Sequence, residues 1–384
     1  MKTDLQISGL MNKDRTWAEV NLSALLHNFR YAQATKKRVM CVLKANAYGH
    51  GALVCGKFLE QNGADAFAVA SLEEGIQLRC GGITLPILVL GYVPPEKIPL
   101  LIEHGLTPSV TSEKHAVLLN RAACDCNKTL TVHVKVDTGM SRLGIAAGVG
   151  TDIQEAAAVV MRICGLSNLD VEGLYTHYAA ANMPSGRDFT LLQYLRFSDI
   201  IKILTNEDMR PRLCHISNSP GILYHGHTCI DMVRAGSLLY GMYPDGIPNE
   251  SGILRPVMTL KAKIAQIQNL AQGATVSYGR TFSCKTDMRV AVVMAGYADG
   301  YPRQLSNVGY DTVSGMRCST LGVVCMDLHC IDAGYLPENA VGMEAVLWGK
   351  GGMSLERAAG LSGMANCEIT CTVGKRVPRI YIID

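Results

Sequence analysis

Between residues 17 and 245, short apolar segments of strand length alternate with segments of helical periodicity. The predicted helices are Asn21–Lys36, with Asn21 as its N-cap, Ser112–Ala123, Thr151–Cys164 and Asp188–Leu204. The predicted strands are Val39–Ala45, Ala66–Leu72, Ile87–Tyr92, Thr107–Val110, Leu130–Thr138, Val171–Tyr178, Leu213–Ser219 and Met232–Tyr240. Eight strands separated by helices predict an α/β fold, a (β/α)8 TIM barrel. A doubly wound open sheet is the main alternative, but the sequence contains no glycine-rich dinucleotide fingerprint to support it.

In a barrel of this kind, chemistry takes place at the C-terminal ends of the strands. Polar residues gather where the predicted strands end: Lys44, Asp137 with Arg142, His177, His215, Asn218, Ser219 and Arg234. The order of elements alone therefore predicts a site at that end of the barrel.

After the predicted barrel, the pattern changes from alternating strands and helices to mostly strands. Residues 245–252 form a turn-rich linker, and Met258–Ile264 alternates with the period of two that is typical of a strand. Further predicted elements are the strands Val290–Met294, Thr320–Cys325, Ala345–Trp348 and Arg379–Ile383 and a short helix at Ser354–Leu361. We therefore expect two domains, a barrel over residues 1–245 and a mostly-β domain over residues 246–384.

The composition excludes several classes of protein. The 384 residues are 48% hydrophobic and 18% charged, which indicates a globular chain with a large core. A net charge of +3, with no basic run longer than residues 36–38, argues against nucleic acid as a partner. The 14 cysteines are scattered without a C-x-x-C pair, so we expect reduced thiols, a cytoplasmic location and no metal site. No apolar stretch approaches the roughly 20 residues that span a bilayer, so we expect no membrane contact by this chain. It could still be the cytoplasmic part of a longer, membrane-tethered protein.

One lysine stands directly after the apolar run Val39–Leu43. Partial burial lowers the pKa of a lysine and frees its amine as a nucleophile or base, as a Schiff base with an aldehyde cofactor requires. Taken alone, Lys44 could equally be a lysine that reaches past a strand end into solvent. The following residues favour a functional role, because residues 44–51 read Lys-Ala-Asn-Ala-Tyr-Gly-His-Gly.

These eight positions resemble the pyridoxal 5'-phosphate (PLP) lysine motif of the alanine racemase family. The resemblance implies that Lys44 carries PLP covalently and acts as a catalytic base, and that Tyr48 binds the cofactor phosphate. It also implies a fold-type III PLP enzyme with an N-terminal barrel and a C-terminal β domain.

Further barrel motifs resemble the same family. Residues 135–144, Lys-Val-Asp-Thr-Gly-Met-Ser-Arg-Leu-Gly, are similar to its K-V-D-T-G-M-x-R-L-G element. The resemblance implies that Lys135 is carbamylated and that Arg142 contacts the cofactor phenolic oxygen or the substrate carboxylate. It also places His177 beside the cofactor ring, although an isolated histidine is more often a core residue.

Two more elements complete the implied cofactor site. His215-Ile-Ser-Asn-Ser219 resembles the family H-x-x-N-S element, although Asn and Ser also commonly begin helices. The implied phosphate ligands are Asn218, Ser219 and the amides of Gly236 and Ser237. Arg234 would bond the pyridine nitrogen; because arginine stays charged and does not give up its proton, that nitrogen would stay unprotonated. A weaker electron sink favours clean return of a proton, which a racemase requires.

The C-terminal half contributes three further motifs. Tyr278 lies in a V-S-Y-G turn, Tyr297 in G-Y-A-D-G and Met326 in C-M-D, and each resembles a family element. The resemblance implies that Tyr278 is the second base, that Tyr297 lines the route of the substrate and that the Met326 amide holds the substrate carboxylate. A phenol has a pKa of about 10, so Tyr278 would need positive neighbours to act near neutral pH. The resemblance further implies a homodimer with shared active sites.

One stretch departs from the family pattern. Where the family has a tyrosine before the glutamate of a Y-E-x-x-C element, this chain has Asn366 and Cys367 before Glu368. Loss of the phenol predicts a pocket that accepts serine as well as alanine, because an apolar pocket rejects an added hydroxyl only about a hundredfold. This is similar to the serine/alanine racemases of vancomycin resistance, whose racemase domain is attached to a membrane domain.

We therefore expect an enzyme that interconverts L- and D-alanine and L- and D-serine and supplies D-amino acids for peptidoglycan precursors. A strict alanine racemase, a non-catalytic PLP carrier and an amino-acid decarboxylase of the same fold type are the alternatives.

Overall fold

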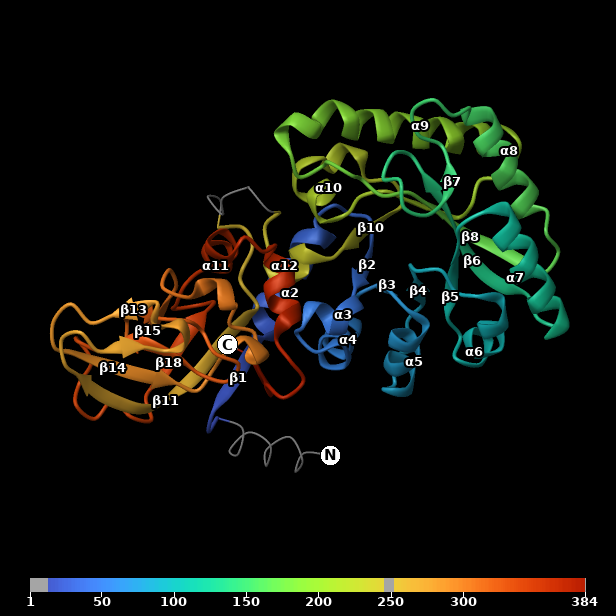
Figure 1. The fold of residues 1–384 in the computed structure, drawn as a ribbon. Coiled ribbons are helices and arrows are strands. Elements are labelled where there is room, and N and C mark those ends of the chain that lie inside the picture. The colour runs from blue at the N-terminus through green and yellow to red at the C-terminus, as the bar shows by residue number, and fades with distance from the viewer. Residues whose placement is uncertain (1–12, 245–251, 384) are drawn as a thin grey trace. The chain divides into compact units, whose positions relative to one another are not determined.

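The computed structural model describes residues 13–244 and 252–383, which form two compact units (Figure 1). The barrel unit contains Asn28–Ala47 and Ala52–Leu239. Of the described residues, the C-terminal unit contains those from 13 to His27, the short segment Tyr48–Gly51 and those from Tyr240 onward. The predicted domain boundary at residues 245/246 falls outside the described residues and stays a prediction.

The barrel unit is built on eight parallel strands in the order β10-β2-β3-β4-β5-β6-β8-β9. Backbone hydrogen bonds from Asp231 N to Cys214 O (3.1 Å) and from Arg234 N to Ser217 O (2.9 Å) join β9 to β10 and close the sheet. This confirms the predicted (β/α)8 barrel and excludes the open sheet. The strands are β2 (Arg38–Val42), β3 (Ala66–Val69), β4 (Ile87–Val89), β5 (Thr107–Val110), β6 (Leu130–Asp137), β8 (Leu169–Tyr175), β9 (Leu213–His215) and β10 (Met232–Ala235), with β7 (Ile145–Ala146) beside β6.

Helices connect the strands, and their first residues follow the expected capping chemistry. The α-helices of this part of the chain are α2 (Leu22–Gln33), α4 (Ala52–Gln61), α5 (Leu72–Cys80), α6 (Ile98–Glu103), α7 (Glu113–Asp125), α8 (Ile153–Cys164), α9 (Arg187–Asn206) and α10 (Ser219–Tyr224). Asn21 Oδ1 accepts a hydrogen bond from Ala24 N (2.8 Å), as its prediction as an N-cap requires. Ser112 Oγ accepts from His115 N at 3.1 Å in the same way.

The strands are buried but mostly shorter than predicted. All four residues of β3 are buried, as in strands covered on both faces, which explains why their sequences read as apolar runs. In several places the chain leaves the paired strand before the end of the predicted segment and continues as a loop. Thus β2 ends at Val42 rather than at Ala45, and β9 ends at His215 rather than at Ser219.

The C-terminal unit contains an eight-stranded, mostly antiparallel sheet in the order β14-β17-β16-β15-β18-β11-β1-β19. Its strands are β1 (Thr16–Asn21), β11 (Met258–Leu270), β14 (Met288–Val293), β15 (Tyr310–Val313), β16 (Met316–Leu321), β17 (His329–Asp332), β18 (Glu344–Trp348) and β19 (Arg379–Ile382), and β12 (Thr275–Val276) pairs with β13 (Phe282–Ser283). Two helices accompany them, α11 (Leu355–Ser362) and α12 (Asn366–Thr372). The predicted strand Thr320–Cys325 is displaced toward the N-terminus, because Gly322 leaves the extended region with φ +73°.

The first strand of the chain belongs to this sheet. β1 pairs antiparallel with β11 and parallel with β19, and Trp17, Ala18 and Val20 are buried there. Sequence order therefore did not reveal that a segment near the N-terminus completes the C-terminal unit. Within the described residues, no helix combines the length and apolarity needed to cross a bilayer.

Candidate active site

Lys44 begins a left-handed turn at the C-terminal end of β2. Ala45, Asn46, Ala47 and Tyr48 have φ values of 52°, 54°, 55° and 52°. This conformation costs roughly 1–2 kcal/mol per residue, so the surrounding structure must hold it. Glu74 Oε1 accepts from Ala45 N (2.6 Å), and Asn46 Oδ1 accepts from Ala52 N (2.9 Å). The lysine therefore stands on a turn whose shape is fixed from both sides.

Tyr48 and the glycine after it pack within the C-terminal unit. The Tyr48 and Tyr240 rings lie 4.9 Å apart. Gly49 has φ +86°, and a Cβ there would lie 2.0 Å from Thr370 O, so this position requires glycine. Burial raises the pKa of the Tyr48 phenol, and the neighbouring thiols of Cys367 and Cys371 raise it further. The phenol therefore stays protonated at neutral pH and can donate a hydrogen bond to a phosphate oxygen.

Arg234 is buried in the barrel and donates hydrogen bonds to several neighbours. Its Nη1 donates to His215 Nδ1 (2.7 Å) and its Nη2 to His177 Nδ1 (3.1 Å). The same guanidinium donates to the carbonyls of Thr176, His215 and Ile216. Burial lowers the pKa of Arg234 to about 10, so it remains charged at neutral pH.

The two histidines beside Arg234 are neutral. A nitrogen that faces a guanidinium N–H must accept, so neither Nδ1 carries a proton. Burial first, and then the charge of Arg234, hold the pKa values of His177 and His215 well below the usual range. Arg142, Lys135 and Lys44 also lower the pKa of His177. The structure thus brings these predicted barrel residues together around one imidazole.

Lys135 is buried inside the barrel. The residue is 5% exposed, and its Nζ has no hydrogen-bond partner among the described residues. Burial lowers the pKa of its amine to about 8, against the opposing effect of Asp137. An amine with this pKa is neutral in a minority of molecules near pH 7, a far larger share than for an ordinary lysine, and the neutral form is the one that reacts with CO₂.

Asp137 shapes the loop that carries Arg142. Its Oδ1 accepts from the backbone amides of Gly139, Met140 and Ser141, and its Oδ2 accepts from Arg142 N at 2.9 Å. These hydrogen bonds hold the pKa of Asp137 below its usual range although burial opposes them. The sequence predicted that Asp137 lies near the site, but it did not reveal that the Asp137 carboxylate holds the backbone of residues 139–142 in place.

The predicted phosphate ligands form a small hydrogen-bonded group. Ser219 Oγ accepts from Gly236 N (3.0 Å) and Leu238 N (3.1 Å). The Gly236 amide, which was predicted to face phosphate, is therefore engaged by Ser219 in this structure, and Ser237 follows it in the same turn. Asn218 Oδ1 accepts from Gly221 N (3.1 Å), so Asn218 also has the ordinary role of a helix cap.

Tyr278 belongs to the C-terminal unit and borders a pocket of about 390 Å³. The residue is 73% exposed. The pocket is lined by Ser277, Tyr278, Cys325, Met326, Asp327 and Leu328. Ser277, with φ +65°, donates from Oγ to Val323 O and lies 3.3 Å from Cys325 Sγ. The two predicted residues Tyr278 and Met326 therefore share one pocket.

Tyr297 is tied to the same loop through its backbone. Tyr297 N donates to Cys325 O, and Ala298 N donates to Met326 O, both at 3.1 Å. The buried carboxylate of Asp299 closes this turn by accepting from Gly296 N (3.0 Å). Arg15 and Arg376 pair with Asp299 at 2.6 Å and 2.8 Å. Sequence reasoning missed both arginines, because 284 and 77 positions separate them from Asp299.

Asn366 and Cys367, which replace the family tyrosine, have different neighbours. Asn366 is buried, and its Nδ2 donates to Tyr243 O at 2.9 Å. Cys367 is partly exposed and is an electrostatic neighbour of the Tyr48 phenol. Cys367 is therefore the position of the two that lies near a predicted cofactor-binding residue, Tyr48.

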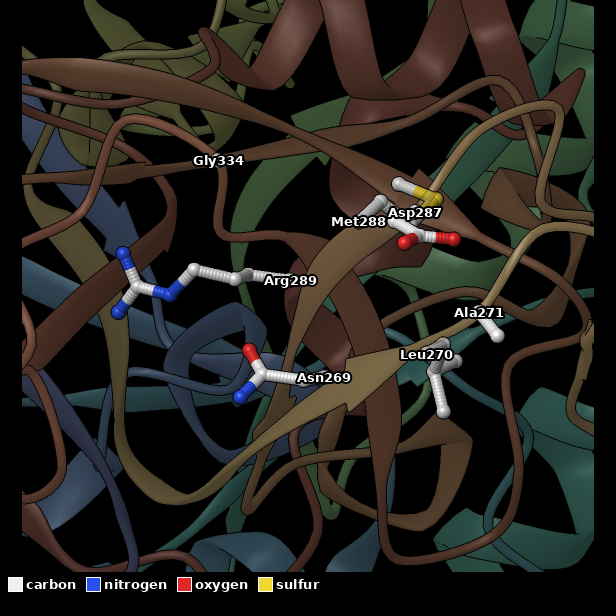
Figure 2. A pocket seen from close by; sticks show the side chains of 7 residues that line it. All are labelled: Asn269, Leu270, Ala271, Asp287, Met288, Arg289 and Gly334. Atoms are coloured by element: carbon white, nitrogen blue, oxygen red, sulfur yellow. The ribbon is translucent and has the colours of Figure 1, made fainter.

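A larger pocket, of about 610 Å³, lies elsewhere on the C-terminal unit (Figure 2). Its Arg289 donates to the carbonyls of Leu336 and Pro337, and its Asp287 accepts from Gln272 N. These charged groups stabilise their own loops, and no predicted site residue is among the lining residues that Figure 2 labels.

Comparison with known proteins agrees with the geometry. A family model described as "Alanine racemase, N-terminal domain" matches residues 20–244, and one described as "Alanine racemase, C-terminal domain" matches residues 257–381. The chain belongs to the alanine racemase family.

Relatives and solved structures of alanine racemases match along nearly the whole chain. An alanine racemase of Carboxydothermus hydrogenoformans is 40% identical over 95% of this chain and 99% of its own length. One from Desulforamulus reducens is 38% identical over 96% of this chain and 100% of its own length. The solved alanine racemase of Clostridium difficile 630 has a TM-score of 0.89 and 34% identity, covering 96% of each chain.

Membership of the alanine racemase family makes this chain a PLP-dependent isomerase. The residues present fit PLP. Arg234, which stays charged at neutral pH, suits an anionic cofactor, and Lys44 on its fixed turn supplies an amine that can bond an aldehyde. PLP and an alanine racemase fold, both predicted from the motifs, are confirmed.

Proposed function

We propose that this chain racemises alanine and also serine, with Lys44 and Tyr278 as the two acid/base groups. The observation that carries the proposal is Arg234, which donates to two neutral imidazoles at the centre of a cationic barrel end. Lys44, Tyr48, His177, Asn218, Ser219, Arg234, Gly236 and Ser237 would hold PLP, and Arg142, Tyr297, Met326, Asn366 and Cys367 would surround the amino acid.

PLP held by these residues would supply electron withdrawal from the amino-acid α-carbon, which would make the α-proton acidic. The Lys44 amine exchanges that proton on one face, for the D-isomer, and the Tyr278 phenol exchanges it on the other, for the L-isomer. Arg234 donates a hydrogen bond but keeps its proton, because its pKa of about 10 leaves it charged at neutral pH. A ring nitrogen that receives no proton from Arg234 would make the cofactor a weaker electron sink, which favours return of the proton to the α-carbon.

The test is α-proton exchange in deuterated water with L-alanine and L-serine side by side, reading chirality and deuterium together. Racemisation with deuterium uptake on both substrates is expected. Uptake on alanine alone would leave a strict alanine racemase. Bound PLP without exchange would favour a non-catalytic carrier, and release of CO₂ would favour a decarboxylase.

The serine proposal rests on the absence of a tyrosine at residues 366 and 367. Because Cys367 is the one beside Tyr48, Cys367→Tyr should depress serine turnover relative to alanine turnover, and Asn366→Tyr is the comparison variant. An unchanged ratio in both variants would contradict the proposed basis of serine activity.

We also propose a homodimer whose partner supplies Tyr278. Its large exposure supports this, since a residue that completes a partner's site is open on its own subunit. Lys44→Ala and Tyr278→Phe should each be inactive. Mixing the two should restore activity, because a hybrid dimer has one site with both bases intact. Failure to recover activity in a verified hybrid would contradict shared sites.

Lys135 is the proposed site of a carbamate. Its neutral fraction and buried, unpartnered Nζ support this, and the carbamate would give Arg142 an anionic partner. Growth or incubation with ¹³C-bicarbonate should produce a carbamate carbon signal in the NMR spectrum that Lys135→Met lacks.

We also propose that the enzyme supplies D-amino acids for peptidoglycan. Rescue of a D-alanine auxotroph tests that role.

A further inference from the structure

A line of side chains on β10, β9, β6 and β8 leads from Arg234 to Glu172. Arg234 Nη1 lies 2.7 Å from His215 Nδ1, and His215 Nε2 lies 2.9 Å from His133 Nδ1. His133 Nε2 lies 3.5 Å from Glu172 Oε2. Both histidines are buried, whereas the Glu172 side chain is 28% exposed. The line therefore connects the buried arginine to a carboxylate that reaches solvent.

Two local features of β8 produce this line. The pairing of β6 with β8 shifts register, from Val132 opposite Val171 to His133 opposite Gly173, so Glu172 is the extra residue of a bulge. A bulge re-aims the side chain that it carries. Gly173 leaves room for the His133 ring, since a Cβ there would lie 2.4 Å from His133 Nδ1.

The donors along the line all point the same way. Because Arg234 can only donate, His215 Nδ1 accepts, and the ring of this neutral histidine carries its proton on Nε2. That proton is donated to His133 Nδ1. His133 then carries its own proton on Nε2, which faces the Glu172 carboxylate. Each tautomer is thus determined by its neighbour, from the guanidinium to the carboxylate.

Glu172 is suited to terminate this line as an anion. The hydrogen bond from His133 is the main cause that holds the pKa of Glu172 below its usual range, and Arg212 adds to it. Arg212 Nη2 lies 3.7 Å from Glu172 and 2.8 Å from Asp170. Asp170 therefore shares Arg212 with Glu172 but makes no contact with either histidine of the line among the described hydrogen bonds and ion pairs.

We propose that Glu172 is a positioning residue for the cofactor site, which acts through His133 and His215 to keep His215 Nδ1 as the acceptor for Arg234. Its importance for catalysis rests on the role proposed above for Arg234. Without Glu172, His133 is free to carry its proton on Nδ1. His215 would then have to accept on Nε2 and present an Nδ1–H to a guanidinium N–H, which places two donors face to face.

The experiment uses ¹⁵N-histidine-labelled holoenzyme and follows tautomers by NMR together with steady-state kinetics. In the wild type, His133 and His215 should both be neutral with the proton on Nε2. Glu172→Leu should mix the tautomers and lower kcat about tenfold with little change in KM, the lower end of the effect of losing such a supporting partner. Glu172→Gln, whose side-chain oxygen still accepts, should restore the tautomers and most of kcat.

Asp170→Asn is the matched control, because it alters the partner of Arg212 and leaves His133 untouched. Unchanged tautomers in Glu172→Leu would overturn the proposal, as would an equal loss of kcat in Asp170→Asn. Mixed tautomers with unchanged kcat would also overturn the positioning role. Absence of racemase activity in the wild type would refute the proposed function instead, while the NMR spectrum would still report on the line.

Discussion

Two buried histidines, one in each unit, have similar surroundings and opposite protonation. In the barrel, His215 stacks on Tyr175 with ring centroids 5.0 Å apart, and the Tyr175 hydroxyl bonds Ser109. In the C-terminal unit, His329 stacks on Tyr301 at 4.3 Å, and the Tyr301 hydroxyl bonds Thr320. Each ring is buried and lies flat against a buried tyrosine.

The partners at the ring nitrogens decide the difference. His215 Nδ1 faces a guanidinium and must accept, whereas His329 donates from Nδ1 to Ala295 O (2.7 Å) and from Nε2 to Asp311 (2.8 Å). Burial alone would lower the pKa of both rings. Asp311 and the Ala295 carbonyl outweigh burial and raise the pKa of His329, whereas Arg234 adds to burial at His215. The charge of the neighbouring side chain, positive for Arg234 and negative for Asp311, thus decides whether each buried histidine is neutral or protonated.

The two rings also stabilise different things. His329 begins β17 directly after the Cys325–Leu328 loop, and its bond to Ala295 O holds the segment that leads into Tyr297. It therefore links two loops that carry proposed substrate contacts. His215 instead keeps an arginine in place beneath the proposed cofactor site.

The largest expected effect comes from breaking the His329–Asp311 pair, whose side chains are both 0% exposed. Removing one member of a buried ion pair typically costs about 3–5 kcal/mol, because the other charge is left buried. Asp311→Ala should lower the free energy of unfolding by that amount. Both tryptophans, Trp17 and Trp348, lie in the C-terminal unit, so urea unfolding followed by tryptophan fluorescence reports on this unit.

A double replacement sharpens this measurement. Asp311→Leu combined with His329→Leu removes both charges, and such apolar replacements are often neutral in stability. It should therefore be less destabilised than Asp311→Ala. Glu344→Gln, which alters a half-exposed pair with Lys261, is a control expected to cost about 1 kcal/mol or less. Equal losses in Asp311→Ala and Glu344→Gln would show that the buried pair is not ionic.

This contrast marks the limit of what the sequence could predict. The barrel followed from the order of apolar and helical patterns, and the motif residues followed from contiguous stretches such as residues 44–51 and 135–144. Neither kind of signal exists for His329 with Asp311 or for His133 with Glu172. Their members are 18 and 39 positions apart, and each pair depends on strand register.

Register also decides features of the fold that local patterns leave open. β1 joins the C-terminal sheet through pairing with β11 and β19, which no local pattern announces. The bulge at Glu172 likewise reverses the inward or outward direction expected from simple alternation. Local patterns therefore predicted which elements form, whereas nonlocal pairing decided which side chains meet.

The second effect is a pH dependence of opposite sign in the two units. The folded pKa of His329 is raised, so its stabilisation is complete below the unfolded pKa of about 6.5 and is lost as pH rises through the folded pKa. The folded pKa of His215 is lowered, so the barrel loses stability as pH falls below about 6.5, where only the unfolded ring takes up a proton. Each full shift of one pKa unit is worth about 1.4 kcal/mol.

Labelled histidines can test this directly. In ¹⁵N spectra of the native protein, His329 should stay doubly protonated above pH 6.5 and His215 should stay neutral below it. The stability difference between wild type and His329→Gln, read by tryptophan fluorescence, should shrink as pH rises above that value. A difference that grows with pH would contradict a protonated His329.

The smallest expected effect concerns the tyrosines on which the rings stack. Tyr301→Phe and Tyr175→Phe each remove one hydroxyl–hydroxyl bond, at 2.8 Å and 2.7 Å, and keep the stacked ring. Each should cost about 1 kcal/mol, the usual net value of one hydrogen bond. In the barrel the loss should be at the lower end, because Ser109 Oγ keeps its bond to Val89 O. Neither substitution should change the protonation of its histidine, since Asp311 and Arg234 remain in contact with the rings. If Tyr301→Phe made His329 neutral in ¹⁵N spectra, the tyrosine hydroxyl rather than the carboxylate would be the deciding contact, and the two histidines would differ for a reason other than the sign of their charged partners.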